Sequence, residues 1–144
     1  METLTKWLAK LNRVELRPIR IMLTTLLKSK IHRARVTRAD RSYEGSVSID
    51  GNLMEAADLV THEHVHVWDV TNGKRFETYV IPAPKGSGTI QINGAAAHHA
   101  KKGDDVIIAS FAHFPKATAL RHQPKIVFVN RRNRIVRIAR KSGT

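Results

Sequence analysis

A Gly-Ser peptide, Gly45-Ser46, lies at the centre of the stretch Arg41–Asp50, and its serine hydroxyl is a candidate reactive group. Gly-Ser pairs are common in surface turns, so the pair taken alone does not indicate a reaction site. Strand-like residues flank this pair, however, and Lys30 and His32 lie a short distance upstream. Whether Ser46 is reactive therefore depends on the groups that the fold brings to it.

Three histidines, His62, His64 and His66, occur at every second position. On a strand this spacing places three imidazole rings on one face, where they could bind zinc or copper. An exposed polar face that alternates with Val65 and Val67 gives the same pattern, and the sequence places no carboxylate or further histidine to complete a site. We therefore expect an exposed strand face here.

Several familiar reactive motifs are absent from the sequence. The chain contains no cysteine, which excludes disulfides, thiolate metal sites and a cysteine nucleophile. It has no G-x-S-x-G nucleophile elbow, P-loop or dinucleotide-binding fingerprint. Gly86-Ser87-Gly88 lies in a loop rich in proline and glycine, without the strand and helix that an elbow needs.

Short strands, which would have to position any reactive group, dominate the chain after Met22. Alternating or β-branched runs bounded by turn residues predict them, and Asn72-Gly73 predicts a tight hairpin. The pattern predicts a single compact, mainly β barrel with short helices. The predicted strands are Leu26–Val36, Ser46–Asp50, Val65–Val70, Arg75–Ile81, Thr89–Ile92, Val106–Phe111, Lys125–Val129 and Ile135–Ile138, and the predicted helices are Leu53–Val60 and Ala95–Ala100.

Residues 1–21 form an N-terminal extension with a pattern of its own. We expect a surface helix packed on its own domain or on a neighbouring molecule, with attachment to a membrane surface as the alternative. A further alternative is that Met22 is the natural start of the protein. No apolar run reaches the roughly 20 residues that span a bilayer, so no membrane span is expected. The apolar residues at helical spacing are Leu4, Trp7, Leu8, Leu11 and Val14, and Pro18 should end the helix.

The net charge of +13 makes nucleic-acid binding a rival interpretation. The charge lies at the ends of the chain, because the segment from Arg121 onward holds eight Lys and Arg and no acid. The middle of the chain is nearly balanced, and only eight Phe, Trp and Tyr are present to stack on bases. We therefore do not expect nucleic acid as the main partner.

A set of short motifs extends over most of the chain. They are Lys30–Thr37, Ala39-Asp40, Tyr43–Ser46, Val70–Tyr79, Ile92–His98, Gly103-Asp104, Val106–Phe111 and Pro124–Val127. In this order and spacing they closely resemble the motifs of the pyruvoyl-dependent aspartate 1-decarboxylases, also called L-aspartate α-decarboxylases. The resemblance runs from about Met22 to about Val136.

The resemblance implies a double-psi β-barrel, mainly β with short helices, assembled as a homotetramer with active sites between subunits. Residues 22–144 would form one catalytic domain after the extension of residues 1–21. The chain would be made as an inactive precursor that cuts itself between Gly45 and Ser46 into chains 1–45 and 46–144. Ser46 would become a covalent pyruvoyl group, and the chemistry would need no metal.

The implied reaction converts L-aspartate to β-alanine and CO₂, for the synthesis of pantothenate and coenzyme A. The substrate amine would form an imine, a Schiff base, with the pyruvoyl ketone before the α-carboxylate is lost. Glycine suits position 45 because, without Cβ, it leaves its carbonyl open to attack. Tyr79 matches the family's proton donor, and Thr78 matches the threonine that hydrogen-bonds the Gly45 carbonyl oxygen during self-processing.

Aspartate has two carboxylates, and Arg75 and Lys30 match the family's cationic positions for them. Which cation takes which carboxylate stays open, and Lys30 and Ser46 would come from different protomers. On a regular strand Arg75 and Tyr79 share a face, whereas Thr78 points away. The other matching pocket residues are His32, Tyr43, Asn93, Gly94, Ala95 and Ala96.

The extension and the basic tail depart from the family pattern but contain no motif residue. The sequence leaves open whether cleavage is spontaneous or needs a maturation partner. The lack of cysteine fits a cytoplasmic location, which is the one we expect. The alternative function is that of a basic β-barrel that binds nucleic acid.

Overall fold

A computed structural model of the protein describes residues 3–11 and 20–140. Its helices are α1 (Leu4–Leu11), α2 (Gly51–Ala56), α3 (Lys116–Ala119) and the 3-10 helix η1 (Gly94–His98). Its strands are β1 (Leu23–Arg35), β2 (Arg38–Asp40), β3 (Ser46–Asp50), β4 (His64–Asp69), β5 (Arg75–Ala83), β6 (Ile90–Asn93), β7 (Asp105–Pro115), β8 (Lys125–Val129) and β9 (Ile135–Arg140).

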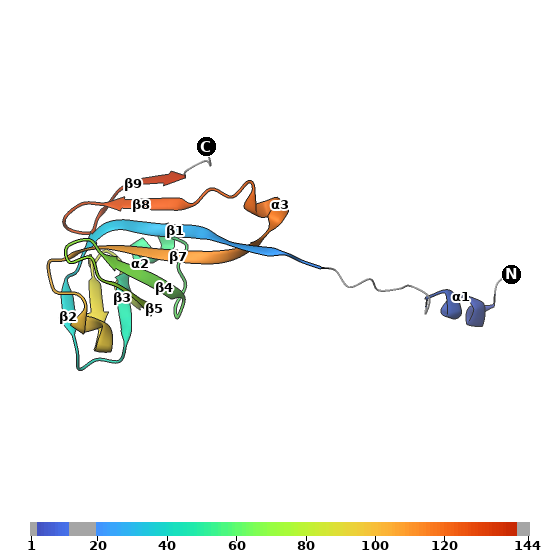
Figure 1. Cartoon of the computed structure of the whole chain (residues 1–144), viewed down its shortest axis with the longest axis horizontal. Coiled ribbons are helices and arrows are strands. Elements are labelled where there is room, and N and C mark those ends of the chain that lie inside the picture. Colours follow the sequence, from blue (N-terminus) through green and yellow to red (C-terminus); the bar gives the residue numbers. More distant parts are fainter. Residues whose placement is uncertain (1–2, 12–19, 141–144) are drawn as a thin grey trace.

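The nine strands of the described chain form one hydrogen-bonded sheet in the order β2-β6-β3-β5-β4-β7-β1-β8-β9 (Figure 1). Three neighbouring pairs, β2 with β6, β3 with β5 and β1 with β8, are parallel, and the others are antiparallel. The predicted strands over 46–50 and 125–129 have the predicted bounds.

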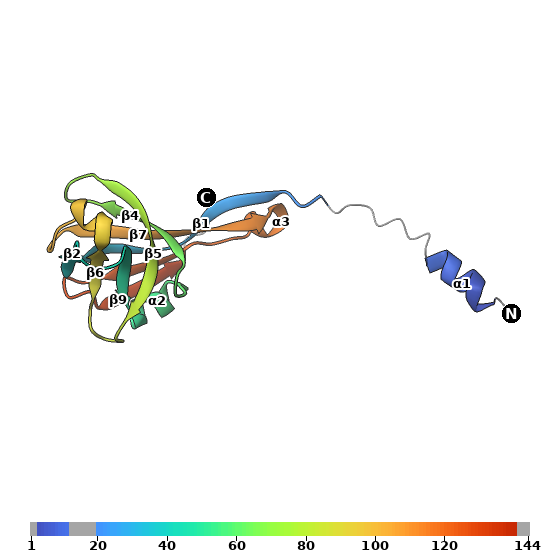
Figure 2. The same ribbon diagram turned by 90° about the horizontal axis from the view of Figure 1, so that it is seen from below.

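The sheet curls back on itself (Figure 1 and Figure 2). Hydrogen bonds join its two ends. Asn133, in the turn between β8 and β9, donates through Nδ2 to the carbonyl oxygens of Gly88 and Arg35, both at 2.8 Å. Gly88 lies just before β6, and the N–H of Thr37 bonds the Ile90 carbonyl of β6 at 2.8 Å. The prediction of a mainly β, barrel-like fold is therefore confirmed.

Side chains alternate between the interior and the surface along the strands. Val65 and Val67 on β4 are fully buried, whereas His64 is exposed and His66 half-buried. The expected exposed polar face of β4 is thus confirmed for His64, whereas His66 is only partly exposed. This period of two is what a sheet with one face on the core requires.

Asp69 closes the hairpin between β4 and β5. Its Oδ1 accepts hydrogen bonds from the N–H groups of Thr71 at 2.9 Å and Asn72 at 3.1 Å. Gly73 adopts the φ of +78° that the tight turn needs, so the hairpin predicted from Asn72-Gly73 is confirmed. Asp69 is 2% exposed, and burial together with the neighbouring carboxyl of Asp104 raises the pKa of Asp69 to about 6.

The two predicted internal helices differ in their bounds. α2 begins at Gly51, ahead of the predicted Leu53, because Asp50 caps it by accepting a hydrogen bond from the N–H of Asn52 at 2.8 Å. It also ends at Ala56, before the predicted end. The helix predicted over residues 95–100 is instead the 3-10 helix η1.

Other differences concern the ends of strands and very short elements. β7 continues to Pro115, past the predicted end at Phe111, because Leu23–Leu27 of β1 pair with its second half. The elements β2 and α3 were not predicted, since three or four residues show no clear periodicity. His62 precedes β4 with φ +69°, so its predicted alignment with His64 and His66 in one row is wrong.

The predicted N-terminal helix is present as α1. Leu4 is 71% and Trp7 54% exposed, and none of the residues of α1 is buried, so the described chain does not show the helix packing on its own domain. The expectations for Val14 and Pro18 concern residues outside those described. Within the described residues, no helix has the length and apolar character needed to cross a membrane.

We expect Asp69→Asn to change how stability depends on pH. With a folded pKa of about 6 and an ordinary value near 3.8, folded Asp69 holds a proton between these pH values that the unfolded chain has released. The free energy of unfolding of the wild type should therefore fall as pH rises through this window, by roughly 1–3 kcal/mol. The amide side chain of the variant cannot titrate, so urea unfolding from pH 4 to pH 7 should show a flatter profile for the variant. Parallel profiles would contradict the prediction.

Candidate active site

Ser46 is the first residue of β3, which lies between β6 and β5 within the sheet. It pairs with Asn93 of β6, and the following residue, Val47, lies beside Val80 of β5. Ser46 is 1% exposed. The candidate nucleophile therefore lies inside the fold, where the protein rather than water must satisfy its hydroxyl.

A buried amide holds the Ser46 hydroxyl. Asn93, 0% exposed, donates through Nδ2 to Ser46 Oγ at 2.9 Å and to Ser48 Oγ at 3.0 Å. Gln91 Nε2 donates to Asn93 Oδ1 at 2.8 Å and so fixes the amide's orientation. Because the amide is the donor, the Ser46 hydroxyl can donate its own proton, and it does so to the Glu44 carbonyl oxygen at 3.3 Å.

Gly94 packs directly on the backbone at Gly45. Its φ is +69°, and a Cβ on Gly94 would lie 2.7 Å from Gly45 Cα and 2.9 Å from the Tyr43 carbonyl oxygen. Both the close approach and the left-handed φ exclude a larger residue without strain. Ala95 and Ala96, also predicted for the site, follow directly in η1.

Thr78 and Tyr79 lie on β5 beside the Gly-Ser peptide. The register of β3 with β5, continued back along both strands, places Tyr79 level with Ser46 and Thr78 level with Gly45. Tyr79 is exposed and Thr78 half-buried, so their side chains point to opposite faces of β5. The Tyr79 ring lies 6.0 Å from the ring of His62, centroid to centroid.

Arg75 begins β5, and its guanidinium lies over the indole of Trp68 on β4, with Cζ 4.6 Å from the ring centroid. Such stacking leaves the edge of the guanidinium available to bind an anion. Both residues line a hollow of about 500 Å³, together with Phe111 and others. Sequence reasoning missed Trp68, because an isolated tryptophan in a strand is typical of packing, and only its pairing with Arg75 across the hairpin could have indicated it.

Lys30 and His32 lie on β1, far from Ser46 in the sheet. β7, β4 and β5 separate β1 from β3, which amounts to four strand spacings or about 19 Å along the sheet. Lys30 and His32 alternate with the buried Ser29 and Ile31, so they share the outer face of β1. Within the described part of one chain, no hydrogen bond or ion pair joins Lys30 to Ser46, whose side-chain partners are Glu44 and Asn93.

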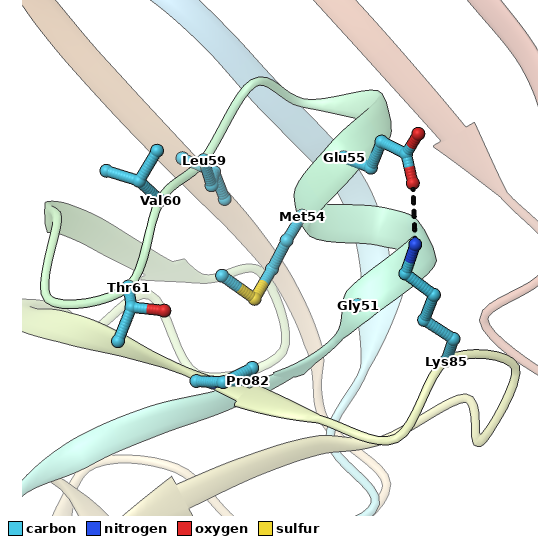
Figure 3. A pocket seen from close by; sticks show the side chains of 8 residues that line it. All are labelled: Gly51, Met54, Glu55, Leu59, Val60, Thr61, Pro82 and Lys85. Carbon is cyan, nitrogen blue, oxygen red and sulfur yellow. Dashed lines mark hydrogen bonds and ion pairs between the residues drawn. The ribbon is translucent and has the colours of Figure 1, made fainter.

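A different hollow lies beside α2 (Figure 3). Its volume is about 360 Å³, and Met54, Leu59 and Pro82 are among its apolar walls. Its charged residues, Lys85 and Glu55, form an ion pair at 3.0 Å. None of the predicted site residues lines this hollow, so it is not the candidate active site.

Residues 22–136 match the family model described as aspartate decarboxylase. The chain belongs to the aspartate decarboxylase family. It is 55% identical over 114 residues to the aspartate 1-decarboxylase of Leptothrix cholodnii, a match that covers 79% of this chain and 87% of that relative. The aspartate 1-decarboxylase of Acinetobacter baumannii is 54% identical over 114 residues, covering 79% of this chain and 90% of the relative. That of Acidovorax sp. is 51% identical over 117 residues, covering 81% and 93%.

The match confirms the family resemblance that the motifs indicated. All the predicted site residues of this aspartate decarboxylase family member, from Lys30 to Ala96, lie within the matched segment. Residues 1–21 precede the matched segment, and the end of the basic tail follows it.

Gly94→Ala should destabilise the fold and disturb the Gly45-Ser46 peptide, because the new Cβ would meet the Gly45 backbone at 2.7 Å. We expect a loss of roughly 1–3 kcal/mol in the free energy of unfolding. Gly73→Ala is the matched control, since Gly73 has a similar φ of +78° but nothing within 4 Å of its added Cβ. Urea unfolding should show the larger loss for Gly94→Ala, and equal losses would contradict the importance of the close approach.

Proposed function

We propose that this protein is a pyruvoyl-dependent aspartate 1-decarboxylase, which converts L-aspartate to β-alanine and CO₂ for the synthesis of pantothenate and coenzyme A. Membership of the family and similarity to proteins named aspartate 1-decarboxylase support the reaction. The observation that carries the proposal is the burial of Ser46 directly after Gly45, with its hydroxyl oxygen accepting a hydrogen bond from the Asn93 amide at 2.9 Å.

The pyruvoyl group would arise by cleavage of the Gly45-Ser46 bond. The Ser46 hydroxyl oxygen adds to the Gly45 carbonyl carbon and the C–N bond breaks, so the acyl group moves from nitrogen to oxygen while the nitrogen takes the proton. Loss of the Ser46 Cα proton and of the Gly45 carboxylate then gives dehydroalanine, and its hydrolysis releases ammonia and leaves a ketone. Asn93 would orient the hydroxyl, and Thr78, level with Gly45, would hydrogen-bond its carbonyl oxygen.

The surroundings of Ser46 fit such a group. Asn93 supplies a buried donor beside it, and the missing side chain of Gly94 leaves room at the peptide to be cut. When present, a pyruvoyl group serves as an electron sink for loss of the α-carboxylate, the task that pyridoxal phosphate performs in other enzymes.

Arg75, Lys30 and Tyr79 are the residues proposed to act on the substrate. Arg75, held over Trp68, presents a planar fork that suits a carboxylate, and Lys30 offers a compact charge for the other carboxylate. Tyr79, level with Ser46 and 38% exposed, is proposed to donate a proton to the α-carbon after CO₂ leaves. His32 and Tyr43 would complete the pocket.

The proposed site needs more than one chain. Because Lys30 and Ser46 are four strand spacings apart within a chain, we propose a homotetramer in which Lys30 and His32 of one protomer reach Ser46 of another. The three parallel strand pairs support a double-psi β-barrel as the family fold. Residues 22–144 would form this catalytic domain, and residues 1–21 its extension.

Nucleic-acid binding is not the favoured function. Family membership accounts for most of the chain. The described cations from Arg131 to Arg140 lie on the β8–β9 hairpin, where Arg137 stacks over the Phe128 ring at 4.0 Å. A nucleic-acid-binding role gives no reason for a buried serine after a glycine. A protein that only binds nucleic acid would keep its Gly45-Ser46 bond intact.

The wild-type protein should separate into fragments 1–45 and 46–144 under denaturing conditions, the larger with the mass expected for a pyruvoyl terminus. Ser46→Ala should remain one chain and form no β-alanine, because the attacking hydroxyl is gone. Ser48→Ala is the matched control, since the Ser48 hydroxyl accepts a hydrogen bond from the same Asn93 amide at 3.0 Å but follows Val47 and not a glycine. This variant should still be cut at Gly45-Ser46. Mass spectrometry and an assay of β-alanine provide the test. A wild type that stayed intact and inert with aspartate after prolonged incubation would contradict the proposal.

Mixing an impaired variant with an inactive one tests the shared site. Lys30→Ala should lose roughly 10–100-fold in kcat/KM, because a hydrogen-bonded charge on the substrate is removed. When Lys30→Ala is co-expressed in equal amounts with Ser46→Ala, up to about a quarter of wild-type activity should return. A quarter is the chance that a site takes its intact Ser46 from one variant and its intact Lys30 from the other. No recovery in verified mixed oligomers would place both residues of each site on one chain.

A further inference from the structure

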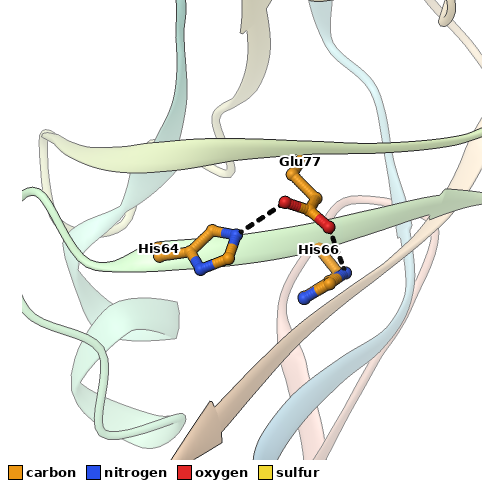
Figure 4. Close-up of side chains that lie close together, drawn as sticks. All are labelled: His64, His66 and Glu77. Carbon is orange, nitrogen blue, oxygen red and sulfur yellow. Dashed lines mark hydrogen bonds and ion pairs between the residues drawn. The ribbon is translucent and has the colours of Figure 1, made fainter.

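His64, His66 and Glu77 form a cluster on the outer face of the β4–β5 hairpin (Figure 4). The two histidines are two residues apart on β4, and Glu77 of β5 lies directly opposite His66. One carboxylate oxygen of Glu77 is 3.1 Å from His64 Nε2 and the other is 3.5 Å from His66 Nδ1. The sequence showed the histidines but could not place Glu77 beside them.

We propose that these three side chains, which lie beside the proposed substrate anchor Arg75, bind a divalent transition metal ion of the zinc type that the proposed decarboxylation does not itself use. Potential ligand atoms of all three lie within 4.8 Å of one another. Two ligand atoms about 2.1 Å from a tetrahedral zinc ion are about 3.4 Å apart, so small side-chain rotations would bring the cluster to that geometry. Two imidazoles and a carboxylate, with water in the fourth position, are a donor set that zinc accepts.

The hairpin restricts where the three ligands can lie. The pairing of β4 with β5 fixes the backbones of His66 and Glu77 opposite each other, and the buried Val65 holds both histidines on the outer face. The rings of His64 and His66 are 5.1 Å apart, and the His66 ring also packs edge-on against Phe111 at 5.1 Å. Binding a metal would therefore order few groups that are not already placed.

The surroundings leave the cluster open to solvent on one side and place one positive charge near it. His64 and His66 line the hollow of about 500 Å³ that also contains Arg75, so solvent can supply the remaining ligand. Arg75, two residues before Glu77, would repel a bound metal ion, but its guanidinium lies over Trp68. Within the described residues, the Glu77 carboxylate lies within 4.0 Å of the nitrogens of the two histidines and of no Lys or Arg. His62, with φ +69° and its ring against Tyr79, is not part of the cluster.

Zinc titration of the tag-free, full-length protein tests the proposal. After treatment with EDTA and dialysis, calorimetry with zinc chloride should show about one bound ion per chain. Glu77→Gln and His64→Gln should each weaken zinc binding roughly 10–100-fold or more, since loss of a residue that only supports a metal ligand already costs that much. The double variant His64→Gln/His66→Gln should abolish zinc binding. His98→Gln, which changes an exposed histidine outside the cluster, should bind like the wild type.

Electron paramagnetic resonance with copper(II) gives an independent readout, because coupling to two imidazole nitrogens should appear in the wild type and vanish in the double variant. The same titration on Ser46→Ala separates this proposal from the proposed function, since metal binding requires neither cleavage nor activity. A wild type that binds no zinc, or cluster variants that bind it as the wild type does, would overturn the proposal.

Discussion

The buried amide of Asn93 must find its hydrogen bonds inside the protein, and the geometry around Ser46 depends on this requirement. A buried polar group left unpaired costs about 1–3 kcal/mol, so the bonds to Ser46, Ser48 and Gln91 stabilise one arrangement of β3 and β6. A slip of one residue between these strands would turn Ser46 to the other face and leave the amide without its partners. The position of the serine is thus set by the pairing of strands inside the sheet.

The local sequence pattern was sufficient to predict the elements whose apolar and polar residues alternate clearly. The strands Ser46–Asp50 and Lys125–Val129 and the turn at Asn72-Gly73 could be predicted because their signals lie within a few residues of sequence. Strand pairing is not local, and for that reason the stacking of Arg75 on Trp68 and the approach of Glu77 to His66 could not be predicted. The error at His62 has a similar cause, since nothing in the alternating histidines indicated a left-handed φ before β4.

The family motifs linked residues that are distant in the sequence, which periodicity could not do. They selected Gly45, Asn93 and Gly94 as parts of one site although nearly fifty residues separate the first from the others. The structure packs Gly94 against Gly45 and brings the Asn93 amide to the neighbouring Ser46. Lys30 shows the limit of a single chain, because β1 and β3 are not neighbours in the sheet. The outer face of β5 presents Arg75, Glu77 and Tyr79 at successive positions roughly 7 Å apart, so that a proposed substrate anchor, metal ligand and proton donor share one strand.

The place of β1 and β2 in the sheet bears on what scission at Gly45 would do to the molecule. β1 lies between β7 and β8, and β2 pairs with β6, so the shorter piece would remain interleaved with the longer one through hydrogen bonds on both sides of β1. Ile31 and Ala34 of that piece are fully buried among residues of the longer one. The nicked protein would therefore migrate as a single particle on a sizing column, and only a denaturant would part the two polypeptides.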